Sequence, residues 1–550
     1  MSATYVTTPI YYVNDRPHIG HAYSTVAADL CCRYARLRGA AAWLLTGTDE
    51  HGQKVERRAR EEGLEPQDFV DRMLPPFRAL PALMHCDIDD FIRTTEPRHK
   101  RAVQALWQRL EAAGDIYLGE YEGWYSVHSE AFYTEKDLLD GKLCPVSKKP
   151  VERVKEKSYF FRLSKYTEPL LQHYEAHPDF VQPVGRFNEV KRFVAEGLHD
   201  LSISRTSFRW GVPVASCPEH VMYVWLDALT NYLSALGAPA AGETTDPRFA
   251  QWWPPAGRAV HIVGKDILRF HAVYWPAFLL SAGLPLPTQV WAHGWLTVNG
   301  EKMSKSSGNF IPPDAICNAL GADVLRYYLM REVAFGQDGD FSHPKVLARY
   351  HGDLGNGLGN LLQRMLSGIV AKHLDGRVPI VAVRPLEGED KALAELAQDV
   401  AGRAAAHYAA MAPQRALEAI WELVFACNRY VDQMAPWALA KAGDKVRLGQ
   451  VCYHVLETLR WLSVMLWPCM PEKADALRQQ LGLGALLPNV GQDVWPSVWG
   501  GLGGGGRTQP GPALFPRFEG VQEQELLARM GYVDAAQAAV EAKAAALQTA

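Results

Sequence analysis

Two short segments carry side chains whose types and spacing could bind a polyphosphate. The first, Pro17-His18-Ile19-Gly20-His21, follows a strand-like run and opens a helix-like one. A helix start offers free backbone N–H groups and the positive end of the helix dipole to an anion, and two imidazoles can add donors. Gly20 leaves room for a flat base to approach. By itself this His-x-Gly-His pattern is a weak signal, and a capped helix start explains it equally well.

The second segment is Lys302-Met303-Ser304-Lys305-Ser306-Ser307-Gly308-Asn309. Its two lysines lie among small, flexible residues, so the loop could close over a polyphosphate and neutralise charge that develops in a transition state. Alone, such a run is usually a solvated loop. The combination of both segments, in this order on an α/β frame, is what indicates ATP chemistry.

The elements around the first segment predict a doubly wound α/β domain. Tyr5–Val13 is rich in β-branched and aromatic residues, as strands are. From Gly20 to Arg38 apolar residues recur at helical spacing until Gly39 ends the helix. Ala42–Thr46 is a short apolar run typical of a buried parallel strand. This order predicts a parallel sheet with its binding crevice at the carboxyl ends of the strands.

The middle of the chain predicts a lobe inserted between two halves of this sheet. Residues 117–220 are rich in Tyr, Lys, Glu and short strand-like runs. The α/β pattern then returns with Met222–Leu226, Val260–Val263 and Gln289–Ala292.

The last third of the chain predicts a helix bundle. Amphipathic periodicity with proline breakers runs through Leu393–Met411, Gln414–Val431 and Val446–Leu466. Gly500–Gly506 lacks the Lys-Ser/Thr ending and the flanking strand of a phosphate-binding loop, so we expect a flexible surface loop there. Residues 522–550 predict an Ala-rich terminal helix.

Composition indicates a soluble, intracellular protein of several domains. The 550 residues exceed what one core usually holds, and the net charge of −4 argues against indiscriminate binding to nucleic acid. Nine scattered cysteines form no disulfide framework, which indicates a reducing cytosol. We also expect no membrane span and no secretory signal, since no long apolar run and no basic-then-apolar start occur.

The two segments resemble the HIGH and KMSKS motifs of class I aminoacyl-tRNA synthetases. Four further segments are similar to those of the methionyl-tRNA synthetase family, namely Thr8–Asn14, Thr46–Gly52, Val224–Ala228 and Trp291–Trp295. The resemblance is collinear over most of the chain. The editing domain of the leucine, isoleucine and valine relatives would not fit in this length, and no cysteine cluster matches the zinc site of the cysteine enzyme.

The resemblance implies a fold, a reaction and its participants. The fold is a Rossmann-type catalytic domain with an inserted lobe, followed by an all-α bundle. The reaction is activation of L-methionine by ATP, with Mg²⁺ on the phosphates, followed by transfer to the 3′ end of initiator and elongator tRNA(Met). The implied domains are 1–116 and 221–290 (catalytic), 117–220 (inserted lobe), 291–350 (KMSKS and stem contact), 351–520 (anticodon binding) and 521–550 (C-terminal helix).

The family also implies roles for single residues. The methionine pocket would be built by Ile10, Tyr12, Asp49, Trp225, Ala228, Leu229, Tyr232, Ile267 and His271, with Asp49 receiving the α-ammonium. ATP would be bound by His18, Gly20, His21, Arg205, Asp266, Lys302, Ser304 and Lys305, of which His18, His21, Lys302 and Lys305 are the catalytic set. The anticodon would be contacted by Asn360, Arg364 and Trp437.

Several of these residues have a plain alternative reading. Aromatic walls suit a polarisable thioether, yet each pocket aromatic alone is more typical of an ordinary core. Asp49 alone could be a turn residue, Arg205 could make a surface contact, and Trp437 could serve hydrophobic packing.

The sequence departs from the family pattern at two places. Many relatives carry a zinc knuckle of two cysteine pairs, but the matching stretches here read Tyr125-Ser-Val-His-Ser129 and Cys144-Pro-Val-Ser147. Only Cys144 remains of four expected ligands, so we expect no structural zinc. Only residues 519–550 follow Phe518, too few for the dimerising oligonucleotide-binding barrel of some relatives, so a cytoplasmic monomer is expected.

Two other functions stay open on the residues alone. A nucleotidyltransferase acting on a small molecule would share the sheet and the first segment, but it would not need Asn360, Arg364 and Trp437. A catalytically inert tRNA-binding paralogue would be expected to lose signature residues, whereas both segments are intact here.

Overall fold

The structure is a computed structural model that describes residues 3–127, 131–133, 135–238, 246–298, 300–303, 309–381, 386–518 and 523–532. The chain divides into two compact units. The first comprises Met1–Pro17, Ala41–Ala82 and Cys86–Trp295, and the second His18–Ala40, Leu83–His85 and Leu296–Ala550.

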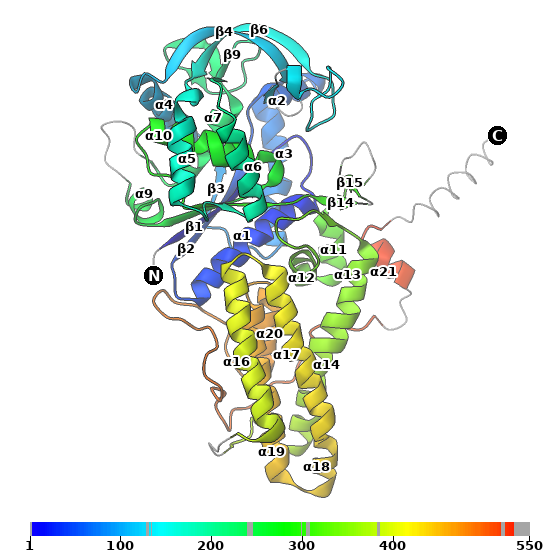
Figure 1. The fold of residues 1–550 in the computed structure, drawn as a ribbon. Helices are drawn as coiled ribbons and strands as arrows, with labels where there is room; N and C mark the ends of the chain where they lie inside the picture. The colour runs from blue at the N-terminus through cyan, green and yellow to red at the C-terminus, as the bar shows by residue number, and fades with distance from the viewer. Residues whose placement is uncertain are drawn as a thin grey trace, which may run out of the picture. The chain divides into compact units, whose positions relative to one another are not determined.

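A six-stranded parallel sheet forms the centre of the first unit (Figure 1). The strand order is β3-β2-β1-β12-β13-β7, and every neighbouring pair is parallel. The strands are β1 Thr4–Tyr12, β2 Ala42–Asp49, β3 Asp90–Arg93, β7 Val181–Gln182, β12 Arg258–Gly264 and β13 Gln289–His293. The predicted doubly wound sheet is therefore confirmed, and its order reverses between β1 and β12, where such sheets bind ligands.

Strand β1 shows how the local sequence shapes this crevice. Its register against β2 shifts between Thr7 and Ile10, on either side of Pro9. Proline has no N–H group to donate, so the ladder cannot continue evenly through it. Beyond the shift, Tyr12 pairs with Asp49, which places these two residues together at the carboxyl ends of their strands.

Antiparallel strands make up the predicted inserted lobe. The long strands β4 (Ile116–Ser126) and β6 (Glu152–Phe161) pair from Ile116 opposite Phe161 to Tyr125 opposite Glu152. β5 (Ala131–Tyr133) and β8 (Leu201–Ser202) complete this sheet. Residues 117–220 are not all separate from the central sheet, however, because β7 is its edge strand beside β13.

Helices before, within and after the lobe complete the first unit. Residues 222–226 lie at the end of β11 (Cys217–Met222) and the start of α7 (Val224–Leu229), so this returning stretch is not a central strand. The other helices are α2 Gln53–Glu61, α3 Pro66–Leu83, α4 Pro97–Ala112, α5 Thr167–Ala176, α6 Val184–Ala195, α8 Asn231–Ser234, α9 Pro247–Trp252 and α10 Trp275–Ser281. A 3-10 turn, η3 (Lys265–Ile267), and a π-helical segment, η4 (Phe270–Tyr274), follow β12.

The second unit begins with α1 (Ile19–Leu37), the helix predicted from Gly20 to Arg38. Gly39 ends it with a φ of 75°, a conformation that glycine adopts without strain. A small sheet of β14 (Leu296–Val298), β15 (Glu301–Lys302) and β16 (Gly339–Asp340) also belongs to this unit.

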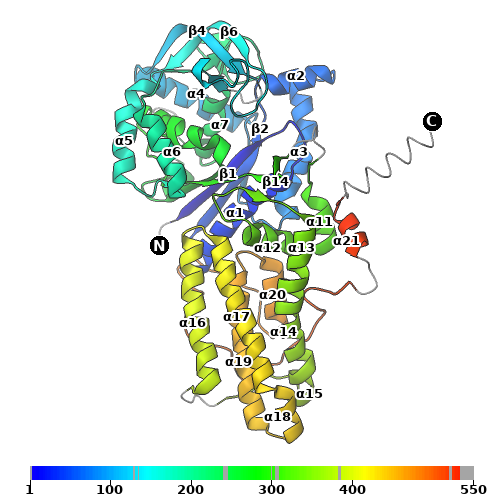
Figure 2. The same ribbon diagram turned by 45° about the vertical axis from the view of Figure 1, so that its right-hand side comes forward.

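The predicted helix bundle is confirmed, and its long helices run beside one another (Figure 2). These are α16 Gly388–Ala409, α17 Pro413–Met434 and α19 Lys445–Leu466. Prolines 413, 436 and 471 stand at the first positions of α17, α18 (Pro436–Ala442) and α20 (Pro471–Gln480), where a missing N–H costs nothing.

The remaining helices of this unit are shorter. They are α11 Pro313–Leu320, α12 Ala322–Glu332, α13 His343–Arg349, α14 Asn360–Gln363, α15 Ala371–His373 and α21 Glu523–Arg529, with the π-helical segments η6 Tyr350–Gly359 and η7 Arg364–Val370. Of the predicted terminal helix, residues 523–529 are helical, Gly531 follows with a positive φ, and residues 533–550 lie outside the described part. No helix within the described residues has the length and apolar character needed to cross a membrane.

The glycine run after residue 499 is a loop, as predicted, but it is anchored. The N–H groups of Gly500, Gly501 and Leu502 donate to the carboxylate of Glu457 at 2.9, 3.0 and 2.9 Å. Glu457 is fully buried on α19 and also accepts from Arg460 and Trp461. The predicted surface loop is therefore confirmed, and its first three residues are tied to a buried carboxylate that is distant in the sequence.

Candidate functional site

The carboxyl ends of β1 and β2 bring Tyr12 and Asp49 together in the first unit. The Tyr12 hydroxyl donates to the backbone oxygen of His51 at 3.1 Å, and the Val13 N–H donates to the backbone oxygen of Asp49 at 3.4 Å. The Asp49 side chain belongs to a residue that is 7% exposed. Because so little water reaches this carboxylate, a cationic group of a ligand would stabilise its charge.

An aromatic cluster forms from α7, α8 and the segment after β12. Trp225 stacks on Phe270 at 3.8 Å between ring centroids, and its edge meets His271 at 6.4 Å. Ala228, Leu229 and Tyr232 are buried beside them, and Ile10 and Ile267 pack partly buried against the same core. The structure thus brings Trp225, Tyr232 and His271 together in one cluster, whereas Tyr12 lies with Asp49 at the ends of β1 and β2.

His271 is held as a neutral imidazole in this cluster. Its Nδ1–H donates to the Ile267 carbonyl oxygen at 2.9 Å, and its Nε2 accepts from the Tyr232 hydroxyl at 2.7 Å. Burial lowers the pKa of His271 to about 4. A neutral ring with both nitrogens used presents an apolar, polarisable surface, as a thioether requires.

A second buried cluster, which the sequence analysis did not assign, also includes a residue of α7. Asp227 accepts from His51 Nδ1 at 2.6 Å and from His99 Nε2 at 2.7 Å. All three side chains are at most 2% exposed. Burial opposes ionisation of Asp227, but the two histidines outweigh it and hold the pKa of this carboxyl below its ordinary value.

The signal for this cluster was present in the sequence. Asp227 interrupts the apolar run of α7, Val224-Trp-Leu-Asp-Ala-Leu229, and a charged residue in such a run is buried only when it is paired. Its partners could not be named, because His51 and His99 lie 176 and 128 residues away.

Two predicted ATP-binding residues of the first unit lie in contrasting surroundings. Arg205, on β9 (Ser204–Arg205), is 2% exposed; its Nη1 donates to Ser202 Oγ at 2.9 Å, and its guanidinium lies over the rings of Tyr125 and Tyr223. Asp266 is exposed on η3, immediately after the carboxyl end of β12. A Cβ at Gly264 would lie 2.6 Å from Asp266 Oδ1, so glycine leaves this carboxylate its place.

In the second unit, the start of α1 is a capping box made of histidines. His18 is the N-cap, and its Nδ1 accepts the Gly20 N–H at 3.0 Å. The His18 N–H in turn donates to His21 Nδ1 at 3.0 Å. A Cβ at Gly20 would lie 2.7 Å from His18 Cε1, so only glycine fits there.

This capping box determines which ring atoms can act as donors. Both Nδ1 atoms accept backbone N–H groups, so the proton of each neutral ring is on Nε2. Burial, with a further contribution from His18, lowers the pKa of His21 well below its ordinary value. The two histidines can therefore both cap the helix and bind an anion. Their Nδ1 atoms accept backbone N–H groups, and their Nε2–H groups are donors.

The second signature segment is described only in part. Lys302 is the last residue of β15 and its backbone pairs with Thr297 of β14. Ser304 and Lys305 lie outside the described residues. Their assigned roles stay predictions.

The helical region brings two of the predicted anticodon residues together. Arg364 binds Asp432 at 2.7 Å, and its guanidinium lies 5.6 Å from the centre of the Trp437 ring. Trp437 is 47% exposed, which does not fit simple hydrophobic packing. Asn360, the first residue of α14, precedes Arg364 by one helical turn.

The stretch that corresponds to the zinc knuckle does not fit a metal. The Cys144 thiol is fully buried and accepts the Ser147 N–H at 3.4 Å, so it serves a local turn. Ser126 and Ser147 offer hydroxyls, which zinc sites in proteins rarely use. His128 and Ser129 lie outside the described residues, and among those described no cluster of three or more His, Cys, Asp or Glu could hold a metal.

Comparison with known proteins assigns these features to one family. Residues 4–366 match the family model of tRNA synthetases class I (M). The methionine–tRNA ligase of Rhizobium meliloti is 47% identical over 526 residues, covering 94% of this chain and 98% of that protein. That of Caldanaerobacter subterraneus is 45% identical, covering 94% of this chain and 79% of that protein.

Solved structures agree with the sequence relatives. The structure of Mycobacterium tuberculosis methionyl-tRNA synthetase in complex with methionyl-adenylate superposes with a TM-score of 0.88 at 45% identity, covering 94% of this chain and 100% of that one. The chain therefore belongs to the class I methionyl-tRNA synthetase family.

Proposed function

We propose that this chain activates L-methionine with ATP through the residues described above and then transfers the methionyl group to the 3′ end of initiator and elongator tRNA(Met). The observation that carries the choice of amino acid is the neutral His271, held between Tyr232 and the Ile267 carbonyl in an aromatic pocket. Such a pocket suits the side chain of methionine, and the nearly buried Asp49 suits its α-ammonium.

In the first step, a carboxylate oxygen of methionine attacks the α-phosphorus of ATP. An O–P bond forms, the bond to the β-phosphate breaks, and pyrophosphate leaves with its electron pair. The attacking carboxylate is already ionised at neutral pH, so no general base is needed. Alignment of the reactants and stabilisation of the phosphate charge remain as the work of the protein.

The charge stabilisation is assigned to residues of the second unit. The backbone N–H groups of Ile19, Gly20 and His21 already donate within the protein, so the donors suited to phosphate oxygens are the Nε2–H groups of His18 and His21, at the positive end of the α1 dipole. Gly20 leaves space beside them, and the family resemblance assigns Lys302, Ser304 and Lys305 to the same polyphosphate. Mg²⁺ bound to the phosphates supplies additional positive charge.

In the second step, a hydroxyl of the terminal tRNA ribose attacks the acyl carbon of methionyl-adenylate, and AMP leaves. We assign anticodon contact to Asn360, Arg364 and Trp437 in the helical region 351–520. We further infer a cytoplasmic monomer without structural zinc. Catalysis is assigned to residues 1–116 and 221–290, with 117–220 as an inserted lobe, 291–350 as a stem-contact region and 521–550 as a terminal helix.

Amino-acid-dependent exchange of pyrophosphate into ATP tests the activation step. Methionine should support rapid exchange, whereas leucine, isoleucine and cysteine should not. Lys305→Ala tests the assigned role of this lysine, and we expect it to slow exchange strongly while methionine still binds. Exchange that does not depend on methionine would indicate a different nucleotidyltransferase, and no exchange at all would indicate an inert tRNA-binding paralogue.

A further inference from the structure

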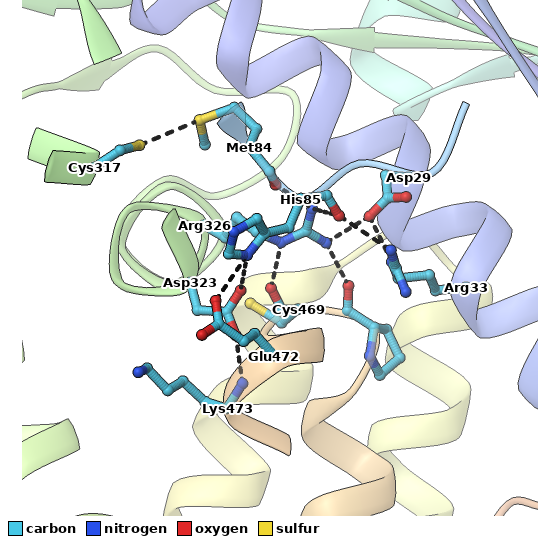
Figure 3. A network of polar contacts seen from close by, with 11 residues as sticks. Asp29, Arg33, Met84, His85, Cys317, Asp323, Arg326, Cys469, Glu472 and Lys473 are labelled. Atoms are coloured by element: carbon cyan, nitrogen blue, oxygen red, sulfur yellow. Dashed lines mark hydrogen bonds and ion pairs between the residues drawn. The ribbon is translucent and has the colours of Figure 1, made fainter. Parts of the chain in front are cut away.

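A buried arginine connects three segments of the second unit (Figure 3). Arg326 lies on α12, and its side chain is 0% exposed. A guanidinium carries five N–H groups, and five hydrogen bonds account for them. The acceptors are Cys469 O (2.7 Å), Met84 O (2.9 Å), His85 O (3.4 Å), Asp29 Oδ2 (2.6 Å) and Pro468 O (2.9 Å).

The charged partner of Arg326 belongs to α1. Asp29 is fully buried and also accepts from Arg33 Nε at 2.8 Å, one turn further along the helix. Two guanidinium groups therefore share one carboxylate away from water. Removing the Asp29 charge would leave the fully buried Arg326 guanidinium without a counter-ion, so α1 is strongly restrained at this point.

The other acceptors belong to two turns. Pro468 and Cys469 lie between α19 and α20, and Met84 and His85 lie after α3. Asp323, three residues before Arg326 on α12, holds the turn after α3 and the first turn of α20, since it accepts from His85 Nδ1 at 3.3 Å and from the Lys473 N–H at 2.7 Å. One face of α12 thus ties α1 to the end of the long bundle helix α19.

We propose that Arg326 is a positioning residue for methionine activation, which acts by fixing α1 through Asp29. The proposal rests on the proposed function of His18 and His21. These histidines stand at the N-terminus of α1, about 16 Å along a rigid helix from Asp29. Donors to a developing phosphate charge must be placed within a few tenths of an ångström, so a shift of this helix along its axis would slow the chemistry.

A purely stabilising role accounts less well for this arrangement. A buried ion pair often contributes no more to stability than well-packed apolar side chains of similar size. What it does provide is a defined orientation, because the N–H groups of the planar guanidinium donate in fixed directions. The network joins residues as far apart as 297 positions in the chain, which is consistent with fixing one helix relative to others.

Asp29→Asn tests the proposal, with Glu457→Gln as the matched control. Both changes remove the charge of a fully buried carboxylate that binds an arginine in the same unit, but Glu457 holds the loop at Gly500–Leu502 instead of α1. Methionine-dependent pyrophosphate exchange is measured below both unfolding transitions, and methionine affinity is measured separately without ATP.

We expect Asp29→Asn to lower kcat for exchange by about tenfold or more, with methionine affinity within about twofold, because only the ATP-facing donors move. Glu457→Gln should leave kcat within about twofold of the wild-type value, even if its Tm falls by as much as that of the Asp29→Asn protein. If Asp29→Asn does not fold, Arg326→Lys replaces it in the test. Lysine keeps the positive charge but cannot donate to all the backbone carbonyls that the guanidinium reaches, so we expect the same fall in kcat.

Equal loss of kcat in the Asp29 and Glu457 variants at matched Tm would overturn the proposal, since the network would then only stabilise the fold. Unchanged kcat in a folded Asp29→Asn or Arg326→Lys protein would overturn it too. Absence of methionine-dependent exchange in the wild-type chain would instead refute the proposed function, so the two failures are distinguishable.

Discussion

The buried side chain of Asp227 joins its own helix to two distant parts of the first unit. It lies on α7 between Trp225 and Ala228, and through His51 it restrains the turn that follows Asp49. The carbonyl of the same His51 accepts the Tyr12 hydroxyl. His99 ties this arrangement to α4, so one carboxylate joins α7, α4 and the segment after β2, which carry or adjoin the residues assigned to methionine.

Asp227→Asn should therefore weaken methionine binding more than it slows the chemistry. We expect KM for methionine to rise by about tenfold, a fall in the free energy of unfolding of about 3 kcal/mol, and a smaller change in kcat. Steady-state pyrophosphate exchange and urea unfolding measure these quantities. Asp246→Asn removes a partly exposed carboxylate paired with Arg248, and asparagine can still cap α9 in its place, so this variant should leave KM and stability nearly unchanged. A folded Asp227→Asn protein with wild-type KM would contradict this role.

At the scale of elements, the joint between α17 and α18 explains the exposure of Trp437. Ala435 has a φ of 43°, a left-handed conformation that ends α17 sharply, and Pro436 then begins α18. Trp437 follows at once and lies half exposed beside the guanidinium of Arg364. A planar cation and an exposed indole together form a platform suited to an unpaired base.

Trp437→Ala should reduce tRNA charging and spare methionine activation. Stacking of a base on an aromatic ring contributes about 1–3 kcal/mol, so we expect a loss of about 10- to 100-fold in kcat/KM for tRNA. Pyrophosphate exchange should remain at the wild-type rate. Trp437→Phe keeps an aromatic face and should recover most of the charging. Equal loss of both reactions would show that Trp437 supports the fold.

At the scale of the whole molecule, the inserted lobe has its own source of stability. Its strands β4 and β6 pair continuously over ten residue pairs, from Ile116 opposite Phe161 to Tyr125 opposite Glu152. The buried Cys144 completes a local turn with Ser147. This extent of pairing gives the lobe a hydrogen-bonded backbone framework of its own, which is consistent with the expectation that it needs no zinc.

Metal removal should thus affect activity and leave the fold intact. A zinc-selective chelator is expected to change neither Tm nor pyrophosphate exchange, because the knuckle stretch keeps only one of four cysteine ligands, Cys144. EDTA should abolish exchange, and added Mg²⁺ should restore it, because the ATP phosphates need a divalent cation. Purified protein with one zinc per chain, or a loss of Tm with the zinc chelator, would contradict this expectation.

Local patterns in the sequence were sufficient for much of the fold and for the family, while the roles of single site residues stay predictions. The strand before His18, the helix after it and the three long bundle helices each followed from periodicity and from glycine and proline positions. These properties depend on neighbours within a few residues, so one sequence contains them. The signature segments likewise indicated the family, because each motif is contiguous.

Only the tertiary structure decided which distant residues meet. Nothing local indicated that Asp227 would bind His51 and His99, that Arg326 would reach Asp29, or that Glu457 would anchor the glycine loop. Each pairing satisfies a buried polar group, and the sequence shows the need for a partner but not the partner. The choice depends on which elements pack together, a property of the whole fold rather than of any one segment.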